Sequence, residues 1–213
     1  MVLGSNDAIV STASLMIGVA ASGASRDAIV VSGVAGLVAG SMSMAVGEFV
    51  SVSSQRDAEK ADIERERREL GEQPQAELRE LAALYEKRGL DKELAAKVAE
   101  QLTARDELGA HLRDELGIDE STAARPFQAA WTSAVSFAFF ALVPIGALLV
   151  SPAAYRVGAI SVASLLSLVT LGALGGYLGG ASMARAAVRV TVGGALAMAM
   201  TAAIGRLVGV SVG

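Results

Sequence analysis

Four glutamates near the middle of the chain are spaced so that they could hold a metal ion. Glu66 and Glu69 form one Glu-x-x-Glu pair, and Glu77 and Glu80 form a second pair a little further along. Residues i and i+3 share a helix face, and facing carboxylates on neighbouring helices bind iron or manganese in helical bundles. Glutamate is abundant in this segment, so chance pairs on a solvated helix face are the alternative interpretation.

Two other carboxylates, Asp7 and Glu48, lie in or beside stretches that are almost uncharged. An ionisable group at membrane depth is costly and is therefore a candidate functional group. Each also has a structural interpretation. Asp7 follows Asn6 where we expect a helix to begin, so it could cap that helix, and Glu48 could mark the point where a span leaves the bilayer.

Met44 belongs to a stripe in which every fourth residue lies on one helix face. The stripe consists of Ser32, Gly36, Gly40, Met44 and Glu48. Small residues on a membrane helix indicate close helix packing, which we expect for Ser32 to Gly40. The thioether and the carboxylate at the end of the stripe are possible ligands for a divalent metal, although a single methionine more often packs.

The single histidine, His111, is first interpreted as a solvated surface residue. No catalytic triad, P-loop or dinucleotide-binding fingerprint is found, so the chain is not predicted to be an enzyme, and no prosthetic group is expected. There are no cysteines, which excludes disulfides and thiolate metal sites.

The elements that must position these residues are strongly hydrophobic. Hydrophobic residues make up 53% of the chain and charged residues 19%. Of 22 acidic residues 19 lie between residues 56 and 125, as do 13 of the 18 basic residues. This is the composition of a membrane protein with one aqueous domain. The acidic excess of that domain argues against nucleic acid as a partner, because phosphate binding needs a basic surface.

We predict an all-α membrane protein with five transmembrane helices. A hydrocarbon core of ~30 Å needs ~20 apolar residues, and the uncharged stretches are 8–25, 28–47, 127–150, 157–184 and 190 to the C-terminus. Residues 1–55 are assigned to transmembrane helices 1 and 2, residues 56–125 to a cytoplasmic metal-binding domain, and residues 126–213 to transmembrane helices 3 to 5.

The central domain is predicted to contain three to four amphipathic helices. Breaks are expected at Pro74 and Gly89, with Asp91 as an N-cap and a short last helix over about residues 106–116.

The distribution of Lys and Arg predicts the orientation of the spans. The side that holds the central domain, with 13 of the 18 Lys and Arg residues, is expected to be cytoplasmic. The N-terminus and the loop expected around Arg185 and Arg189 then share that side, and the C-terminus lies outside. No targeting signal is recognised, so the plasma membrane is the simplest location.

Three stretches resemble the vacuolar iron transporter family. They are SNDAIVSTASLMIGVA (residues 5–20), GLVAGSMSMAVGEFVSVSSQRD (residues 36–57) and the final glycine-rich span that ends in IGRL. The order of two spans, an acidic helical insert and three further spans also matches. The resemblance implies a dimeric transporter that moves Fe²⁺, and often Mn²⁺, out of the cytosol by exchange with protons, with a cytoplasmic domain that binds metal through glutamates.

The resemblance also implies roles for particular residues. Members of that family often carry adjacent methionines where this chain has His111 and Leu112, and histidine is itself a ligand for Fe²⁺ or Mn²⁺. The implied ligands of the domain are Glu66, Glu69, Glu77, Glu80, Glu115 and His111. The implied translocation path contains Asp7 and Met44, to which we add Glu48 as the remaining membrane carboxylate.

The leading hypothesis is therefore a homodimeric, proton-coupled exporter of Fe²⁺ and/or Mn²⁺ in a lipid bilayer. Its dimer interface is expected on small residues of the first two spans, which are Gly18, Ala21 and the stripe from Ser32 to Gly40. The alternatives are a membrane-anchored metal sensor and a scaffold whose charged insert docks a partner protein. Neither would move metal across a membrane.

Overall fold

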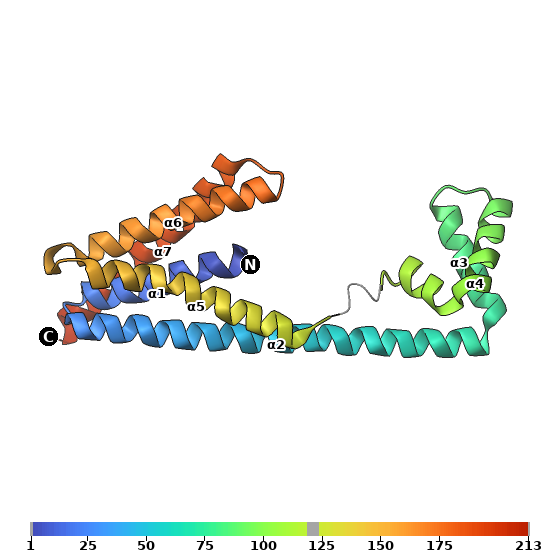
Figure 1. Cartoon of the computed structure of the whole chain (residues 1–213), viewed down its shortest axis with the longest axis horizontal. Coiled ribbons are helices and arrows are strands. Elements are labelled where there is room, and N and C mark those ends of the chain that lie inside the picture. The colour runs from blue at the N-terminus through green and yellow to red at the C-terminus, as the bar shows by residue number, and fades with distance from the viewer. Residues whose placement is uncertain (1, 119–123, 213) are drawn as a thin grey trace. The chain divides into compact units, whose positions relative to one another are not determined.

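The computed structural model describes residues 2–118 and 124–212 (Figure 1). These residues form helices, with no strand among them, so the predicted all-α class is confirmed. The chain divides into two compact units, one of Met1–Glu48 with Phe127–Gly213 and one of Phe49–Pro126. The boundary between the units falls inside helix α2.

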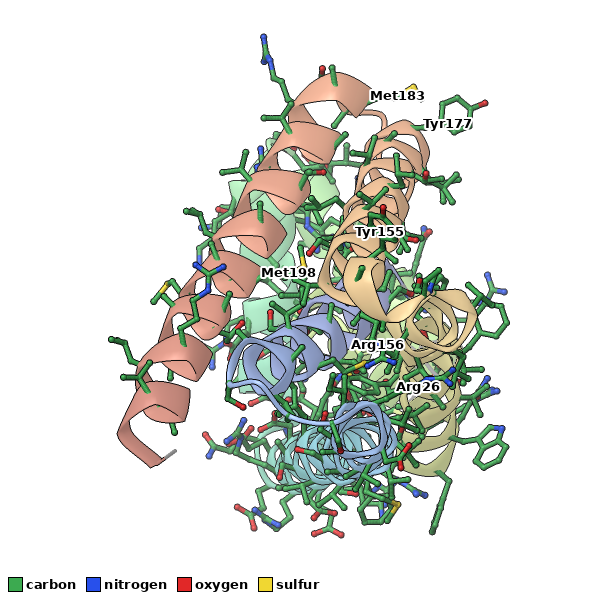
Figure 2. All side chains as sticks on the ribbon, turned by 90° about the vertical axis from the view of Figure 1, so that its left-hand side faces the viewer. Arg26, Tyr155, Arg156, Tyr177, Met183 and Met198 are labelled. Atoms are coloured by element: carbon green, nitrogen blue, oxygen red, sulfur yellow. The ribbon has the colours of Figure 1, made fainter. Side chains whose placement is uncertain are left out.

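The first unit, called the hydrophobic unit here, is built around α1. Its helices are α1 (Val2–Ala21), the first part of α2 (Arg26–Glu72), α5 (Pro126–Val150), the short 3₁₀ helix η2 (Ala153–Tyr155), α6 (Arg156–Leu178) and α7 (Met183–Val212). α1 lies among the other helices and packs directly against α6 and α7 (Figures 1 and 2).

Buried apolar side chains from all five long helices form the core of this unit. Figure 2 shows Met198 of α7 facing the interior. The cluster, called the apolar core here, comprises Ala13, Met16 and Ile17 of α1, Ile29 of α2, Ile145 and Leu148 of α5, Ile160 of α6, and Met198. At the same end of the unit, Arg26 donates a hydrogen bond to the carbonyl oxygen of Leu149 (2.8 Å), which ties the start of α2 to the end of α5.

Four helices in the described part of the chain are long and apolar enough to cross a membrane: the N-terminal part of α2, α5, the segment of η2 and α6, and α7. α1 is not among these four, and it carries Asn6 and Asp7 in its first half. A helix that neighbouring helices surround does not need a fully apolar surface. The fifth span therefore stays a prediction.

The glycines of the α2 stripe allow close packing within the chain. A Cβ at Gly36 would lie 2.9 Å from Cδ2 of Leu15, and a Cβ at Gly40 would overlap the ring of Phe137. Gly18 of α1 is equally crowded, since its Cβ would lie 3.2 Å from the carbonyl oxygen of Thr201. The packing interpretation of the stripe is confirmed, but these glycines contact helices of the same chain.

The boundary between the last two helices differs from the prediction. α6 ends at Leu178 and α7 begins at Met183, so the predicted span over 157–184 is too long. Gly180 adopts a positive φ of 65° in the turn, and the Ser182 hydroxyl accepts a hydrogen bond from the Arg185 N–H (3.5 Å). Because this cap starts the helix early, Arg185 and Arg189 lie in α7 rather than in a loop.

The second unit, called the charged unit here, contains the second part of α2, α3 (Pro74–Lys87) and α4 (Lys92–Asp114). Pro74 begins α3, and Gly89 turns the chain with a φ of 101°. The Asp91 side chain accepts a hydrogen bond from the Leu94 N–H (3.0 Å), as expected of an N-cap.

α4 breaks at Asp106, whose backbone is not helical (φ −163°, ψ 85°). The Asp106 side chain accepts a hydrogen bond from the Gly109 N–H (3.1 Å) and so caps a second segment that carries His111. The predicted break at this position is confirmed. Leu81 of α3 packs against Ala99 and Ala110 of α4 in a small core that fixes the two helices together.

Candidate metal centre and membrane pocket

Three helices of the charged unit bring four potential ligands to one place. Glu66 comes from α2, Glu77 from α3, His111 from the last turn of α4, and Glu115 from the residue that follows it. One ligand atom from each lies within 4.8 Å of the others. His111 Nδ1 lies 2.9 Å from a Glu66 oxygen, 3.2 Å from one of Glu115 and 4.0 Å from one of Glu77.

Three of the four residues of this cluster are buried although they are polar, and Glu115 is half-buried. His111 is 0% exposed, Glu66 3% and Glu77 8%. The expectation of a solvated histidine is therefore wrong, because the break at Asp106 turns His111 inward against α2 and α3. Nε2 of His111 is shielded from solvent and has no hydrogen-bond partner among the described residues. Buried polar atoms without partners are costly, and a cation held by the cluster would supply one.

The electrostatics of the cluster also favour a bound cation. Burial raises the pKa of Glu66, the neighbouring Glu115 charge raises it further, and His111 opposes both effects. Burial followed by the Glu80 charge raises the pKa of Glu77, again against His111. Carboxylates that crowd together in a poorly solvated place repel one another, and a divalent ion would relieve that repulsion.

The second member of each Glu-x-x-Glu pair lies outside the four-residue cluster. Glu69 is half-buried and Glu80 is exposed. Both add negative charge near Glu77. The structure therefore brings together Glu66, Glu77 and Glu115 with His111, and leaves Glu69 and Glu80 as surrounding charge.

A hydrogen-bonded clamp, which the sequence did not lead us to expect, holds the end of α3 against the end of α4. Arg88 donates one bond to a carboxylate oxygen of Asp114 and another to its backbone carbonyl, each 2.9 Å long. The Tyr85 hydroxyl donates to the other carboxylate oxygen at 2.9 Å. Asp114 immediately precedes Glu115, so the clamp fixes the turn that presents His111 and Glu115.

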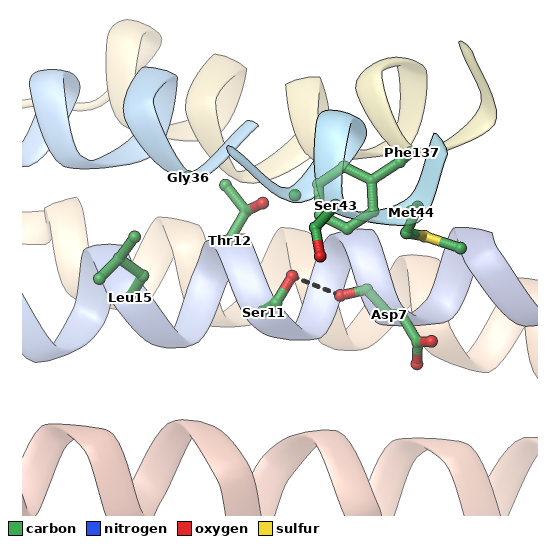
Figure 3. Close-up of a pocket in the computed structure, with 9 residues that line it drawn as sticks. Asp7, Ser11, Thr12, Leu15, Gly36, Ser43, Met44 and Phe137 are labelled. Carbon is green, nitrogen blue, oxygen red and sulfur yellow. Dashed lines mark hydrogen bonds between the residues drawn. The ribbon is translucent and has the colours of Figure 1, made fainter. Parts of the chain in front are cut away.

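The hydrophobic unit contains a pocket of about 340 Å³ between α1, α2 and α5 (Figure 3). Asp7 and Met44 both line it, whereas Glu48, one turn beyond Met44 on α2, does not. The lining consists of Asp7, Ser11, Thr12 and Leu15 of α1, Gly36, Gly40, Ser43 and Met44 of α2, and Phe137 of α5.

Asp7 does not cap a helix, so that structural interpretation is wrong. α1 begins at Val2, which leaves Asp7 inside the helix, and its carbonyl oxygen accepts a hydrogen bond from the Ser11 hydroxyl (2.6 Å). Asp7, Ser11 and Leu15 form the exposed stripe of α1. The pocket lining therefore includes an acidic residue, hydroxyl residues and a methionine beside apolar helices.

Comparison with known proteins gives consistent matches along nearly the whole chain. Residues 1–206 match the family model of the VIT family. A protein of Acanthamoeba castellanii named vacuolar iron transporter is 49% identical over 97% of this chain and 76% of its own length. Vacuolar iron transporter homolog 2 of Oryza sativa subsp. japonica is 41% identical over 97% of this chain and 87% of its own. Vacuolar iron transporter homolog 1 of Arabidopsis thaliana is 37% identical over 98% of this chain and 81% of its own.

Proposed function

The chain belongs to the VIT family, and from that premise we propose that it transports Fe²⁺ and/or Mn²⁺ out of the cytosol across a membrane. The observation that carries the proposal is the buried cluster of Glu66, Glu77, His111 and Glu115. Carboxylate oxygens and an imidazole nitrogen suit both ions. The charged unit would thus collect the ion on the cytosolic side.

The membrane pocket supplies a place for the ion to enter the hydrophobic unit. A bare divalent ion in a low-dielectric span is prohibitively costly unless charges neutralise it. Asp7 lines the pocket and Met44 offers a thioether, whose weak binding suits a site that must release its ion. Glu48 follows on the same face of α2. Carboxylates that take up protons after the metal leaves give proton exchange a physical basis.

A second copy of the chain would complete the pocket. Asp7, Ser11 and Ser43 are exposed on the hydrophobic unit, and a carboxylate that faced lipid would be costly. The glycines that we first expected at a dimer interface pack within the chain. We therefore place the homodimer interface on the exposed part of α2 beside Ser43, which includes Met42 and Val46.

The relatives are named for vacuoles, which favours the membrane of an internal storage compartment over the plasma membrane. The Lys/Arg distribution keeps the charged unit in the cytosol in both cases. Transport is then directed from the cytosol into the compartment.

Flux through empty vesicles tests the proposal. Purified full-length protein in liposomes should take up Fe²⁺ and Mn²⁺, and an opposing proton gradient should increase the rate. Protein-free liposomes are the control, and Co²⁺ and Zn²⁺ measure selectivity. A folded protein that binds these ions but moves none would favour the sensor or the scaffold.

A further inference from the structure

The Thr12 side chain stands out among the hydroxyl groups of the hydrophobic unit. Thr12 is 1% exposed, and its Oγ1 atom has no hydrogen-bond partner among the described residues. Hydroxyls in helices usually bond to the carbonyl one turn earlier, as Thr201 does to Ala197 (3.1 Å) and Thr170 does to Leu166 (2.9 Å). Thr12 leaves that bond unmade.

Thr12 differs from the other buried hydroxyls without partners because it lines the membrane pocket. The others in this unit are Ser14, Ser41, Ser164 and Thr191, and none of them is part of the pocket lining. Figure 3 shows the Thr12 side chain pointing from α1 toward α2, whose Gly36 and Gly40 also line the pocket.

The position of Thr12 along α1 is equally specific. The polar groups that α1 contributes to the pocket are Asp7, Ser11 and Thr12, and the lining ends at Leu15. The neighbouring residues Ala13, Met16 and Ile17 belong to the apolar core. At a rise of ~1.5 Å per residue, Thr12 lies roughly 7 Å deeper than Asp7. It is the last polar group of the lining before the apolar core.

A buried hydroxyl without a hydrogen-bond partner lowers the stability of the fold, so its presence here favours a functional role. A valine of nearly the same shape would fill the space without burying an unsatisfied polar atom. The missing hydrogen bond of Oγ1, the pocket beside it and the position of Thr12 next to the apolar core therefore point to the same role. Each observation fits a side chain that makes its missing contact only while an ion passes.

We propose that the Thr12 hydroxyl is the innermost ligand of the transported divalent cation. This inference rests on the proposed transport function. After the ion has passed Asp7 and Met44, the Thr12 oxygen replaces one of the water molecules bound to the ion. At this depth the pocket lining offers no charged group. A neutral ligand holds the ion weakly enough for it to leave. Because Oγ1 is shielded in this structure, α1 and α2 would have to separate near Leu15 for the ion to reach it.

Paired variants of the full-length protein in liposomes test this role. Thr12→Val removes the hydroxyl and keeps the shape, so Mn²⁺ uptake should fall about tenfold, the effect of one modest transition-state contact. The melting temperature should stay level or rise, because an unsatisfied polar atom is lost. Thr12→Ser keeps the hydroxyl and should retain most of the uptake. Mn²⁺ binding by the charged unit should be unchanged in both variants.

Thr201→Val is the matched control, since its hydroxyl is already bonded within α7. It should lower stability slightly and leave uptake per folded protein unchanged. Uptake by Thr12→Val at the parental rate and KM would overturn this inference alone. So would a lower melting temperature with uptake lost only in proportion to unfolded protein. A parental protein that moves no ion would overturn the proposed function, and this inference with it.

Discussion

At the scale of single residues, the charged unit depends on where each carboxylate points. Glu66 and Glu77 are buried next to His111, while Glu69 and Glu80 are not part of the cluster. A spacing of three residues places two glutamates on one helix face but leaves their burial open. The buried glutamates have already lost most of their hydration, so they could contact a shared ion at little further cost. The others remain hydrated.

We expect Glu66→Gln to weaken Mn²⁺ binding by the full-length protein by at least about tenfold, which corresponds to the loss of ~1.4 kcal/mol. Glu80→Gln, which removes an exposed neighbouring charge, should change binding about threefold or less. Calorimetric titration of the purified protein measures both. Equal losses in the two variants would mean that the carboxylates act only as a diffuse charge.

The pKa shifts predict how the unit without metal responds to pH. The pKa values of Glu66 and Glu77 lie above the ordinary value of 4.5, so the folded unit binds these protons more tightly than the unfolded chain does. The stability they contribute is full below pH 4.5 and is lost as pH rises through the raised values. Acidification from neutral pH toward 4.5 should therefore raise the protection factors of amides in α3 and α4, which are corrected for the intrinsic exchange rate, and Glu66→Gln/Glu77→Gln should reduce this response.

The pKa shift of Asp114 has the opposite sign to those of Glu66 and Glu77. Burial favours its neutral form, but hydrogen bonds from Arg88 and Tyr85 outweigh burial and hold the pKa of Asp114 below its ordinary value of 3.8. Its contribution to stability is present above pH 3.8 and is lost as pH falls through the lowered value. Protection factors of amides in α4 should fall only in that acidic range, and a fall already between neutral pH and 4.5 would contradict both assignments.

At the scale of elements, the clamp between α3 and α4 makes the candidate metal cluster depend on residues outside its set of potential ligands. Arg88→Gln removes both hydrogen bonds to Asp114, so His111 and Glu115 should become less ordered. We expect Mn²⁺ affinity to fall about three- to tenfold, because the hydrogen bonds that hold the turn are lost.

Arg65→Gln is the control for that variant, because Arg65 makes only an exposed ion pair with Asp62 on α2. The Mn²⁺ spectrum in paramagnetic resonance gives a second readout, since looser ligands broaden it. Parental affinity and line shape in Arg88→Gln would show that the last turn of α4 needs no clamp.

Much of this element structure could be predicted from local sequence. Pro74, Gly89 and Asp91 act through their own backbone preferences and caps. Their positions in the sequence were therefore sufficient to predict where α3 and α4 begin. The inward turn of His111 and the clamp by Arg88 were not predictable, since they depend on contacts between residues far apart in sequence. The early start of α7 was missed because the charges of Arg185 and Arg189 suggest a loop between two spans. The Ser182 cap instead starts a helix that already includes both arginines.

At the scale of the whole molecule, the proposed dimer is open to a direct test. The chain has no cysteine, so Met42→Cys or Val46→Cys on the exposed face of α2 introduces a single thiol. If two copies meet there, a short cross-linker should trap dimers in membranes. Leu196→Cys on the exposed face of α7 is the matched control and should give few. Transport by a monodisperse monomer would contradict the homodimer.

The central place of α1 has a further consequence, which concerns biosynthesis. α1 leaves the ribosome before the helices that shield it, since α6 and α7, which pack against it, are the last helices made. Insertion into the bilayer depends on the apolarity of a segment as it emerges, and α1 carries Asn6 and Asp7 in its first half. The nascent α1 should therefore settle only after α7 has been made, and chains truncated before α6 should be retained by membrane quality control.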